Sequence, residues 1–279
     1  MLQPLKRALC RLLQARWAIA FWEDGRLMVA GNPYRDCWFA DPFIVDADER
    51  TVTLLVEDFS LNTQKGTISE LTIDRATWKI CCRRTVLEEP LQLSFPYVVR
   101  REGSRVWFMP ESSRAGRLSV YCYDRTDGCC HREHDLVVAD LSDAILVDGH
   151  VLATRGRGLN GNVLHVYRPH GDGFEEIPAL TFAENVARNA GAVFEHAGKR
   201  YRPAQVCNEW YGEAISIQEV TGAEGHWTMK EVRRVTPPEG FEGIHTLNHY
   251  KDLWVTDLKY YPHPWLSKWT YALLGRTDL

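Results

Sequence analysis

The sequence predicts an all-β fold, a five-bladed β-propeller, on the basis of three observations. A pattern of 46 to 56 residues recurs along the chain, and a repeat of that length built from strands is typical of propeller blades. Aromatic residues make up 11% of the chain, and flat rings pack well on pleated sheets. No window after residue 20 has a long helical periodicity. A length of 279 residues suits one such domain.

The first element is residues 1–20, which we expect to be a basic amphipathic segment that precedes a single propeller domain at 21–279. Arg11 and Arg16 interrupt the apolar run that a secretory signal needs, and the segment is too short and too charged to span a bilayer. We expect a short helix packed on the domain. A weak contact with a membrane surface or a partner is the alternative.

Each of the five repeat units opens with a polar or aromatic residue and a short apolar run, which indicates a buried innermost strand. These opening residues are Asp41, Phe95, Asp143, Asn189 and His245. A turn that carries Gly or Asp follows in each unit, and a second strand comes after it. The second strands end at Glu57, Glu111, Arg155, Gln205 and Asp257.

The ends of these strand pairs predict a functional site. A hairpin brings the start of its first strand beside the end of its second strand. Five blades arranged radially would therefore place up to nine polar side chains around one mouth of the central channel. One such residue would be an ordinary solvated turn residue, whereas nine in register indicate a site.

Eight short stretches carry a family resemblance. They are Trp38-Phe-Ala-Asp-Pro-Phe-Ile, Lys65-Gly-Thr-Ile, Leu93-Ser-Phe-Pro-Tyr-Val, Met109-Pro-Glu-Ser, Arg188-Asn-Ala-Gly, Tyr201-Arg-Pro-Ala-Gln, Tyr211-Gly and Gly243-Ile-His. The chain thereby resembles the N-terminal propeller domain of plant glucosamine inositolphosphorylceramide transferases, a domain also found in bacterial proteins from surface-polysaccharide gene neighbourhoods. The resemblance implies a role with cell-surface glycans. In the plant proteins the transferase activity is assigned to a separate domain.

The order of the motifs is also similar to the five-bladed glycoside hydrolases of families 43 and 32. Those enzymes place an Asp beside a Pro at the start of blade one and a Glu acid in blade three, and Asp41 and Glu111 stand at matching places. The chain departs from them in blade two, where the hydrolases carry a further Asp and this sequence has Ser94-Phe-Pro.

Glycosyl transfer or hydrolysis uses two carboxyl groups that flank an anomeric carbon. We expect Glu111 to be the acid, because the neighbouring Glu57 and apolar walls would raise its pKa. Asp41 would be the base or the nucleophile. The residues expected to bind the substrate are Arg188, Arg202, Gln205, Tyr211, His245, Asp143 and Trp38.

These residues differ in the part of a substrate that each could bind. Arg188 and Arg202 would grip a carboxylate or phosphate, because the guanidinium fork matches both groups. Trp38, Trp107 and Tyr211 would stack on sugar faces or belong to the core. His245 would be a structural residue or would anchor a cation through water, and we predict no direct metal ligands. The cofactor is unknown.

Composition excludes some functions and leaves two open. The net charge of -4 and the scattered basic residues argue against nucleic acid as a partner. Eight cysteines without a C-x-x-C motif predict reduced thiols in a cytoplasmic protein. One function is an enzyme that acts on a glycosidic or glycosyl-phosphate bond of a sugar or glycoconjugate. The other is a non-catalytic propeller that binds a glycan or a partner enzyme.

Overall fold

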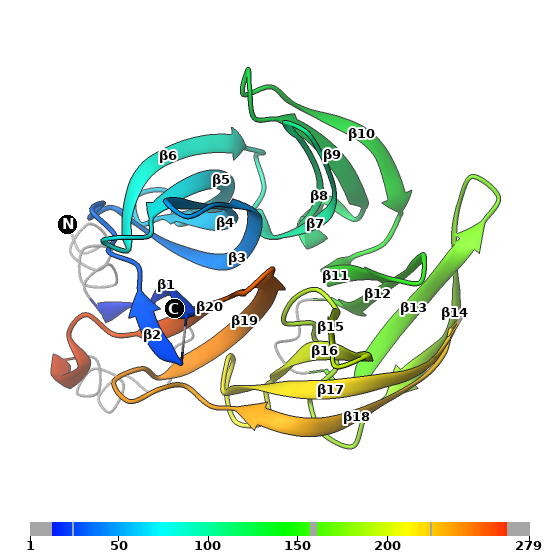
Figure 1. Cartoon of the computed structure of the whole chain (residues 1–279). Helices are drawn as coiled ribbons and strands as arrows, with labels where there is room; N and C mark the ends of the chain where they lie inside the picture. Colours follow the sequence, from blue (N-terminus) through cyan, green and yellow to red (C-terminus); the bar gives the residue numbers. More distant parts are fainter. Residues whose placement is uncertain (1–12, 24, 157–160, 224, 267–279) are drawn as a thin grey trace, which may run out of the picture.

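The computed structural model describes residues 13–266, except 24, 157–160 and 224. In these residues, twenty strands form five four-stranded antiparallel sheets, and the sheets stand around a common centre (Figure 1). This arrangement is a five-bladed β-propeller, so the predicted fold is confirmed. No helix within the described ranges is long and apolar enough to cross a bilayer.

Four blades are each built from consecutive strands. Blade one contains β3 (Cys37–Ala47), β4 (Thr51–Ser60), β5 (Lys65–Asp74) and β6 (Lys79–Leu87). Blade two contains β7 (Ser94–Glu102), β8 (Arg105–Glu111), β9 (Leu118–Asp124) and β10 (Cys130–Val137). Blade three contains β11 (Leu141–Val147), β12 (His150–Arg155), β13 (Val163–His170) and β14 (Gly173–Thr181). Blade four contains β15 (Phe194–His196), β16 (Lys199–Val206), β17 (Ala214–Ala223) and β18 (His226–Val235).

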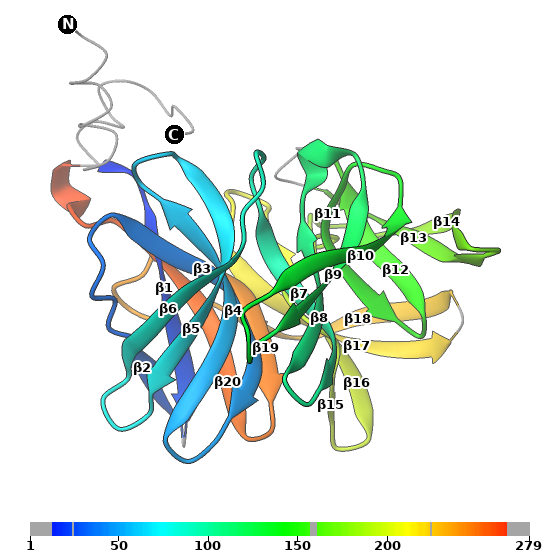
Figure 2. The same ribbon diagram turned by 90° about the horizontal axis from the view of Figure 1, so that it is seen from above.

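Blade five joins the two ends of the described chain. Its inner strands are β19 (Gly243–Tyr250) and β20 (Leu253–Tyr260), and its outer strands are β1 (Arg16–Glu23) and β2 (Arg26–Val29). β1 pairs with β20 from Arg16 opposite Tyr260 to Trp22 opposite Trp254, and Figure 2 shows the two strands side by side. The propeller therefore begins by residue 16, and the boundary expected at residue 21 is wrong. Residues 1–12, where we expected most of the helix, lie outside the described residues.

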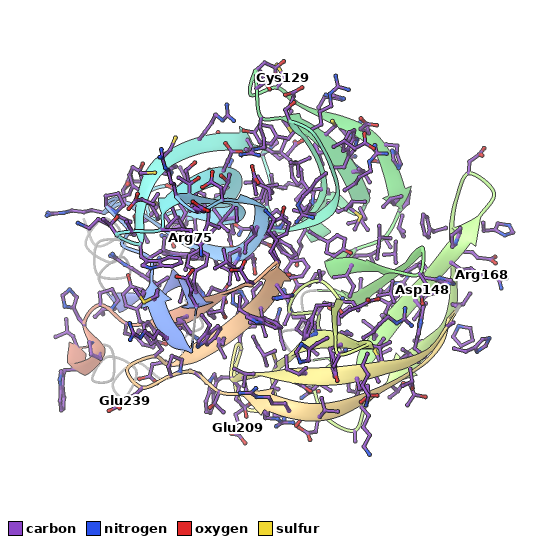
Figure 3. The ribbon with its side chains drawn as sticks, viewed as in Figure 1. Arg75, Cys129, Asp148, Arg168, Glu209 and Glu239 are labelled. Carbon is purple, nitrogen blue, oxygen red and sulfur yellow. The ribbon has the colours of Figure 1, made fainter. Side chains whose placement is uncertain are left out.

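Burial falls from the centre of each blade to its rim, because inner strands are covered on both faces by neighbouring blades. β3 is almost completely buried, whereas β10 is mostly exposed. At the rim, charged side chains such as Arg168 point into solvent (Figure 3). Between blades one and two, the rings of Phe43 and Phe95 meet edge to face with centroids 5.0 Å apart. Aromatic packing of this kind stabilises the blade contacts.

A β-bulge interrupts the innermost strand pair in four blades. The register shifts lie between Ala40 and Phe43, Ser94 and Tyr97, Ser142 and Ile145, and Ile244 and Leu247. In the first three blades one bulge residue has a positive φ, 50° at Asp41, 42° at Phe95 and 48° at Asp143. That conformation is uncommon for residues other than glycine, and such strain is frequent at functional sites. Bulges also redirect side chains. Here the bulge residues Asp41, Phe95 and Asp143 are among the strand ends that predicted the site.

Candidate functional site

The three bulge residues with positive φ donate their backbone N–H groups to carboxylates of the preceding blade. The N–H of Asp41 donates to Asp257 Oδ2 at 2.8 Å, and the N–H of Phe95 donates to Asp41 Oδ2 at 3.0 Å. The N–H of Asp143 donates to Glu111 Oε2 at 3.1 Å. The bulges thus connect carboxyl groups of neighbouring blades. We call Asp41, Glu57, Glu111, Asp143 and Asp257, with the cations Arg188 and His245, the channel network.

Asp41 is 4% exposed and both of its carboxylate oxygens are hydrogen-bonded. Its Oδ1 accepts from Thr246 Oγ1 at 2.7 Å and lies 3.3 Å from His245 Nε2. Burial raises the pKa of Asp41 to about 6, although the charge of His245 opposes the shift. A carboxyl group with a pKa near neutrality can serve as a general base.

His245 lies between two carboxylates. Its Nδ1 is 2.8 Å from Asp257 Oδ1, and its ring packs on Trp17 with centroids 3.9 Å apart. Burial lowers the pKa of His245, but the charges of Asp257 and Asp41 outweigh it and the net shift is upward. Ligand atoms of these three residues lie within 4.8 Å of one another. Because both ring nitrogens face carboxylates, the arrangement suits a protonated histidine that holds the blades together.

Glu111 and Arg188 form the more accessible side of the channel network. Their side chains are 14% and 13% exposed, against 3% for Asp143. Arg188 Nη2 donates to Glu111 Oε2 at 3.4 Å, and Arg188 Nε donates to Asp143 Oδ2. Burial and the charge of Asp143 raise the pKa of Glu111 well above its usual value, and Arg188 opposes this. The carboxylate that raises the pKa of Glu111 most is therefore Asp143, and not Glu57 as the sequence suggested.

Glu57 is paired with Gln92, a residue that sequence reasoning did not select. Gln92 Nε2 donates to Glu57 Oε1 at 2.5 Å, and Gln92 Oε1 accepts the N–H of Gly66 at 2.8 Å. A Cβ at position 66 would lie 2.5 Å from the Leu93 carbonyl oxygen and 2.6 Å from Glu57 Oε1, so this position requires glycine. Burial raises the pKa of Glu57 well above its usual value, and the charges of Asp41 and Glu111 add to the shift.

Gln205 connects blade four to the channel network. Its Nε2 donates to Asp143 Oδ2 at 2.8 Å and to the carbonyl of Asn189 at 2.9 Å. Its Oε1 is buried and has no hydrogen-bond partner among the described residues. An unpaired buried acceptor costs free energy, so this atom is a place where a ligand hydroxyl could donate.

Arg202 and Arg155 do not lie where the sequence predicted, at the mouth of the channel or in contact with a substrate anion. Arg202 is fully buried, with Nε donating to Asn189 Oδ1 and Nη1 to Gln218 Oε1, both at 2.7 Å. Its guanidinium is occupied by protein atoms, so the geometry supports a structural role and not the expected grip on an anion. Arg155 is 3.0 Å from Glu176 and has an exposed side chain, which places it outside the channel network.

Aromatic side chains surround His245 and Arg188. Tyr211 meets the His245 ring at 5.1 Å, and the Arg188 guanidinium lies 5.4 Å from the Tyr211 centroid. Trp17 and Trp38 belong to one buried cluster, against which Tyr211 packs. Trp38 stacks on Phe59 at 4.4 Å, and its buried indole N–H has no partner in the described structure.

Trp107 is not in this cluster. It lies on β8, and its indole N–H donates to Glu133 Oε1 at 3.2 Å on the outer part of blade two. The expected contact of Trp107 with a channel sugar is therefore not supported.

The charges of the channel network do not balance. Five carboxyl groups face two cationic side chains that bond to them in the described structure. Retained protons offset the excess, because burial raises the pKa of Asp41, Glu57 and Glu111. A site that keeps one carboxyl group protonated beside an ionised one has the parts of a general acid and base pair.

Two comparisons find proteins to which the chain is similar. Residues 17–149 match the family described as glucosamine inositolphosphorylceramide transferase 1, N-terminal. The GH43_1 enzyme from Xanthomonas citri, solved with xylose, is similar with a TM-score of 0.54 and 12% identity, over 80% of this chain and 86% of that one. The exo-beta-1,3-galactanase from Phanerochaete chrysosporium has a TM-score of 0.53 and 14% identity, over 88% of this chain and 64% of that one.

At these identities the likeness to the hydrolases concerns the fold. Glu111 ends β8 in blade two, so the expected match to the blade-three acid of the hydrolases is wrong. No curated protein sequence matches the chain. The family match covers the first two blades, the start of the third and strands β1 and β2 of the fifth. The expected resemblance is therefore confirmed: residues 17–149 match the glucosamine inositolphosphorylceramide transferase N-terminal family, and the chain has the five-bladed propeller fold of glycoside hydrolases of family 43.

Proposed function

We propose that the protein is a carbohydrate-active enzyme that transfers or hydrolyses at a glycosidic or glycosyl-phosphate bond during cell-surface glycan biosynthesis in the cytoplasm. One observation carries the proposal, namely that Asp41 and Glu111 have carboxyl groups in different environments within one network. Asp41 is deeply buried and hydrogen-bonded by Thr246 Oγ1, whereas Glu111 is more exposed and has a pKa raised well above its usual value.

These environments assign roles in catalysis. Glu111 donates a proton to the leaving oxygen, because a carboxyl group with a raised pKa keeps its proton near neutral pH. Asp41 acts as the base or the nucleophile, with a pKa of about 6. Glu57 lies close enough to influence both charges and serves as a third carboxyl group that stores a proton.

Two unpaired buried atoms support a sugar as the ligand. Trp38 Nε1 is a donor without an acceptor and Gln205 Oε1 is an acceptor without a donor in the described part of the chain. A sugar hydroxyl can satisfy either atom, because it both donates and accepts. Tyr211 and Trp17 add ring faces beside His245. A hydrolase of the same fold is solved with xylose.

Arg188 is the remaining candidate for a substrate anion. Its guanidinium already bonds to Asp143 and Glu111, so a carboxylate or phosphate would have to share or replace these partners. This engagement makes Arg188 better suited to positioning Glu111 than to forming a separate anion site.

A non-catalytic glycan-binding propeller is the second candidate. The depth of burial favours it, since Asp41 is 4%, Glu57 6% and Asp143 2% exposed. Buried polar groups that bond across blades also stabilise a fold, as the Asp41 N–H does with Asp257. In this case the channel network would hold the blades together, and the aromatic residues would bind the sugar.

The variant Glu111→Gln distinguishes the two candidates. Gln is nearly isosteric but cannot deliver a proton at neutral pH, so turnover should fall by about 10²–10⁴-fold while sugar affinity stays close to that of the wild type. Turnover and binding are measured against sugar nucleotides, aryl glycosides and oligosaccharides. Glu102→Gln is the matched control on the same blade, because the Glu102 side chain is 60% exposed.

The outcomes separate clearly. Loss of turnover in Glu111→Gln, with Glu102→Gln unaffected, supports the enzyme. The binding module is the correct function if the wild type binds a sugar but turns over none of the panel, and if Glu111→Gln binds that sugar with the same affinity.

A further inference from the structure

Three side chains with metal-ligating atoms converge on the outer part of blade two. They are Cys122 on β9 and His131 and Glu133 on β10, and their ligand atoms lie within 4.8 Å of one another. His131 Nε2 is 3.5 Å from Glu133 Oε1. β10 is the strand farthest from the channel in this blade, as Figure 1 shows. The cluster is therefore separate from the channel network.

The pairing of β9 with β10 brings these residues together. Cys122 is the register partner of His131, and directly opposed residues place their side chains on the same face of a sheet. Glu133 follows His131 by two positions and falls where the register shifts between Arg132 and His134. A bulge at that point turns the Glu133 side chain toward its neighbours. The strands thus hold the three groups together without a loop.

A fourth residue orients the carboxylate. Trp107 on β8 is the register partner of Cys122 on its other side, and it donates its indole N–H to Glu133 Oε1 at 3.2 Å. Trp107 is buried, so its ring is fixed by packing. Groups that hydrogen-bond to a metal ligand in this way orient the ligand and raise its affinity for the ion.

A thiolate, an imidazole and a carboxylate together match the ligands that Zn²⁺ prefers. With metal–ligand distances of about 2.0–2.3 Å, ligand atoms at tetrahedral angles lie about 3.3–3.7 Å apart. The His131–Glu133 separation of 3.5 Å falls in that range. We propose that Cys122, His131 and Glu133 form a zinc site on blade two.

Two of the three side chains are open to solvent, which leaves room for a fourth ligand on the zinc ion. Cys122 is buried, but the side chains of His131 and Glu133 are 66% and 35% exposed. The ion would lie at the surface with a water molecule in its fourth position, as in three-ligand zinc sites. Binding releases the thiol proton of Cys122 to solvent, because the thiolate is the ligand.

Cobalt provides a direct test with the full chain after treatment with a chelator. Co²⁺ bound to a thiolate gives a sulfur-to-metal charge-transfer absorption, and Zn²⁺ should displace the cobalt and remove the band. Cys122→Ser and His131→Ala should each abolish the band or weaken binding strongly. Trp107→Phe should lower the affinity by about 10–100-fold, as losses of groups that orient a ligand do.

Matched controls lie on the same strand. Cys130→Ser and His134→Ala change a thiol and an imidazole whose register partners are Tyr123 and Val120, and both variants should keep the band. Thermal unfolding should show that His131→Ala stays folded, because the His131 side chain is 66% exposed. A wild type without a charge-transfer band overturns the proposal. So does a band that survives in both Cys122→Ser and His131→Ala, or one that is lost in either control.

Discussion

Thr246 Oγ1 donates a 2.7 Å hydrogen bond to Asp41 Oδ1, and the two residues are 205 positions apart in the sequence. The bond crosses from blade five to blade one. The candidate base is therefore positioned by a blade that contains both the first and the last strands of the described chain. Its geometry depends on closure of the ring, so a variant that loosens blade five should also disturb Asp41.

Trp38→Phe tests the role of the unpaired indole N–H. The phenyl ring can still stack on Phe59, but it cannot donate to a sugar hydroxyl. A typical hydrogen bond contributes about 0.5–1.5 kcal/mol, so sugar affinity should fall by about 2- to 12-fold. The measurement is calorimetric titration with whichever sugar the wild type binds.

Trp227→Phe is the matched control for Trp38→Phe. Trp227 donates its indole N–H to Asp148 at 3.0 Å in a contact between blades three and four. This variant should lose stability but keep sugar affinity. Equal affinities in the wild type and Trp38→Phe would show that the Trp38 N–H does not contact the sugar.

Stability should fall as the pH rises from about 4 through about 6, between the usual pKa of a carboxyl group and the raised pKa of Asp41. Asp41, Glu57 and Glu111 have pKa values above 3.8 or 4.5, the usual values for Asp and Glu, and the pKa of His245 is raised above 6.5. The folded state thus binds protons more tightly than the unfolded state at all four groups. The free energy of unfolding decreases with pH wherever the native state holds more protons.

Glu57→Gln should flatten this pH dependence. The amide carries no charge, and its oxygen can still accept the Gln92 hydrogen bond. The variant should be more stable than the wild type at pH 8 and similar at pH 4, where Glu57 is largely protonated in both states. Urea unfolding at several pH values measures this difference, with Glu102→Gln as the exposed control. Parallel curves for wild type and Glu57→Gln would contradict the prediction.

Arg202→Ala should destabilise the fold. The change leaves Asn189 Oδ1 and Gln218 Oε1 without their 2.7 Å partners in the interior. Each unsatisfied buried group costs about 1–3 kcal/mol, so the free energy of unfolding should fall by about 2–6 kcal/mol. Denaturant titration measures the loss, and the exposed Arg233→Ala should change stability by less than about 0.5 kcal/mol. Unchanged stability with weaker sugar binding would restore the role in substrate binding.

The thiols should all be free. Seven of the eight cysteines in the sequence are described, and all seven are unpaired in the structure; Cys10 lies outside it. Thiol counting under denaturing, non-reducing conditions should give eight groups, and six or fewer would contradict this expectation. In the native protein Cys81, Cys82 and Cys129 should react first, because they are exposed; Cys129 lies at the rim in Figure 3. Cys37 should react slowly, since burial raises its pKa to about 12.

Much of the site could be predicted from the repeat, because equivalent strand ends meet at the centre of a propeller. This reasoning placed Asp41, Glu57, Glu111 and Asp143 at one mouth of the channel. In the structure the Asp143 N–H donates to Glu111, and Glu57 lies opposite Ala40, the residue before Asp41. The bulges and positive φ values were not visible in the sequence. Asp41 precedes a proline, and such residues usually adopt extended conformations.

Other parts of the site could not be predicted from the sequence. Gln92 and Thr246 are an ordinary amide and hydroxyl that no spacing distinguishes, and β1 completes a blade whose inner strands lie at the other end of the sequence. Arg202 could have been placed correctly. It is three positions from Gln205 on β16, and residues an odd number apart face opposite sides of a strand. Strand periodicity therefore predicts that the two side chains lie on opposite faces of blade four and do not share one binding site.

The pairing of β1 with β20 has a consequence for synthesis on the ribosome. The ribosome releases residues 16–23 long before it makes their partner strand, residues 253–260. At about 5–20 residues per second, β1 waits roughly ten to fifty seconds without its partner. During that interval an apolar strand with an open edge is exposed to other chains. The yield of correctly folded protein should therefore depend on chaperones that protect this early strand and on the rate of translation.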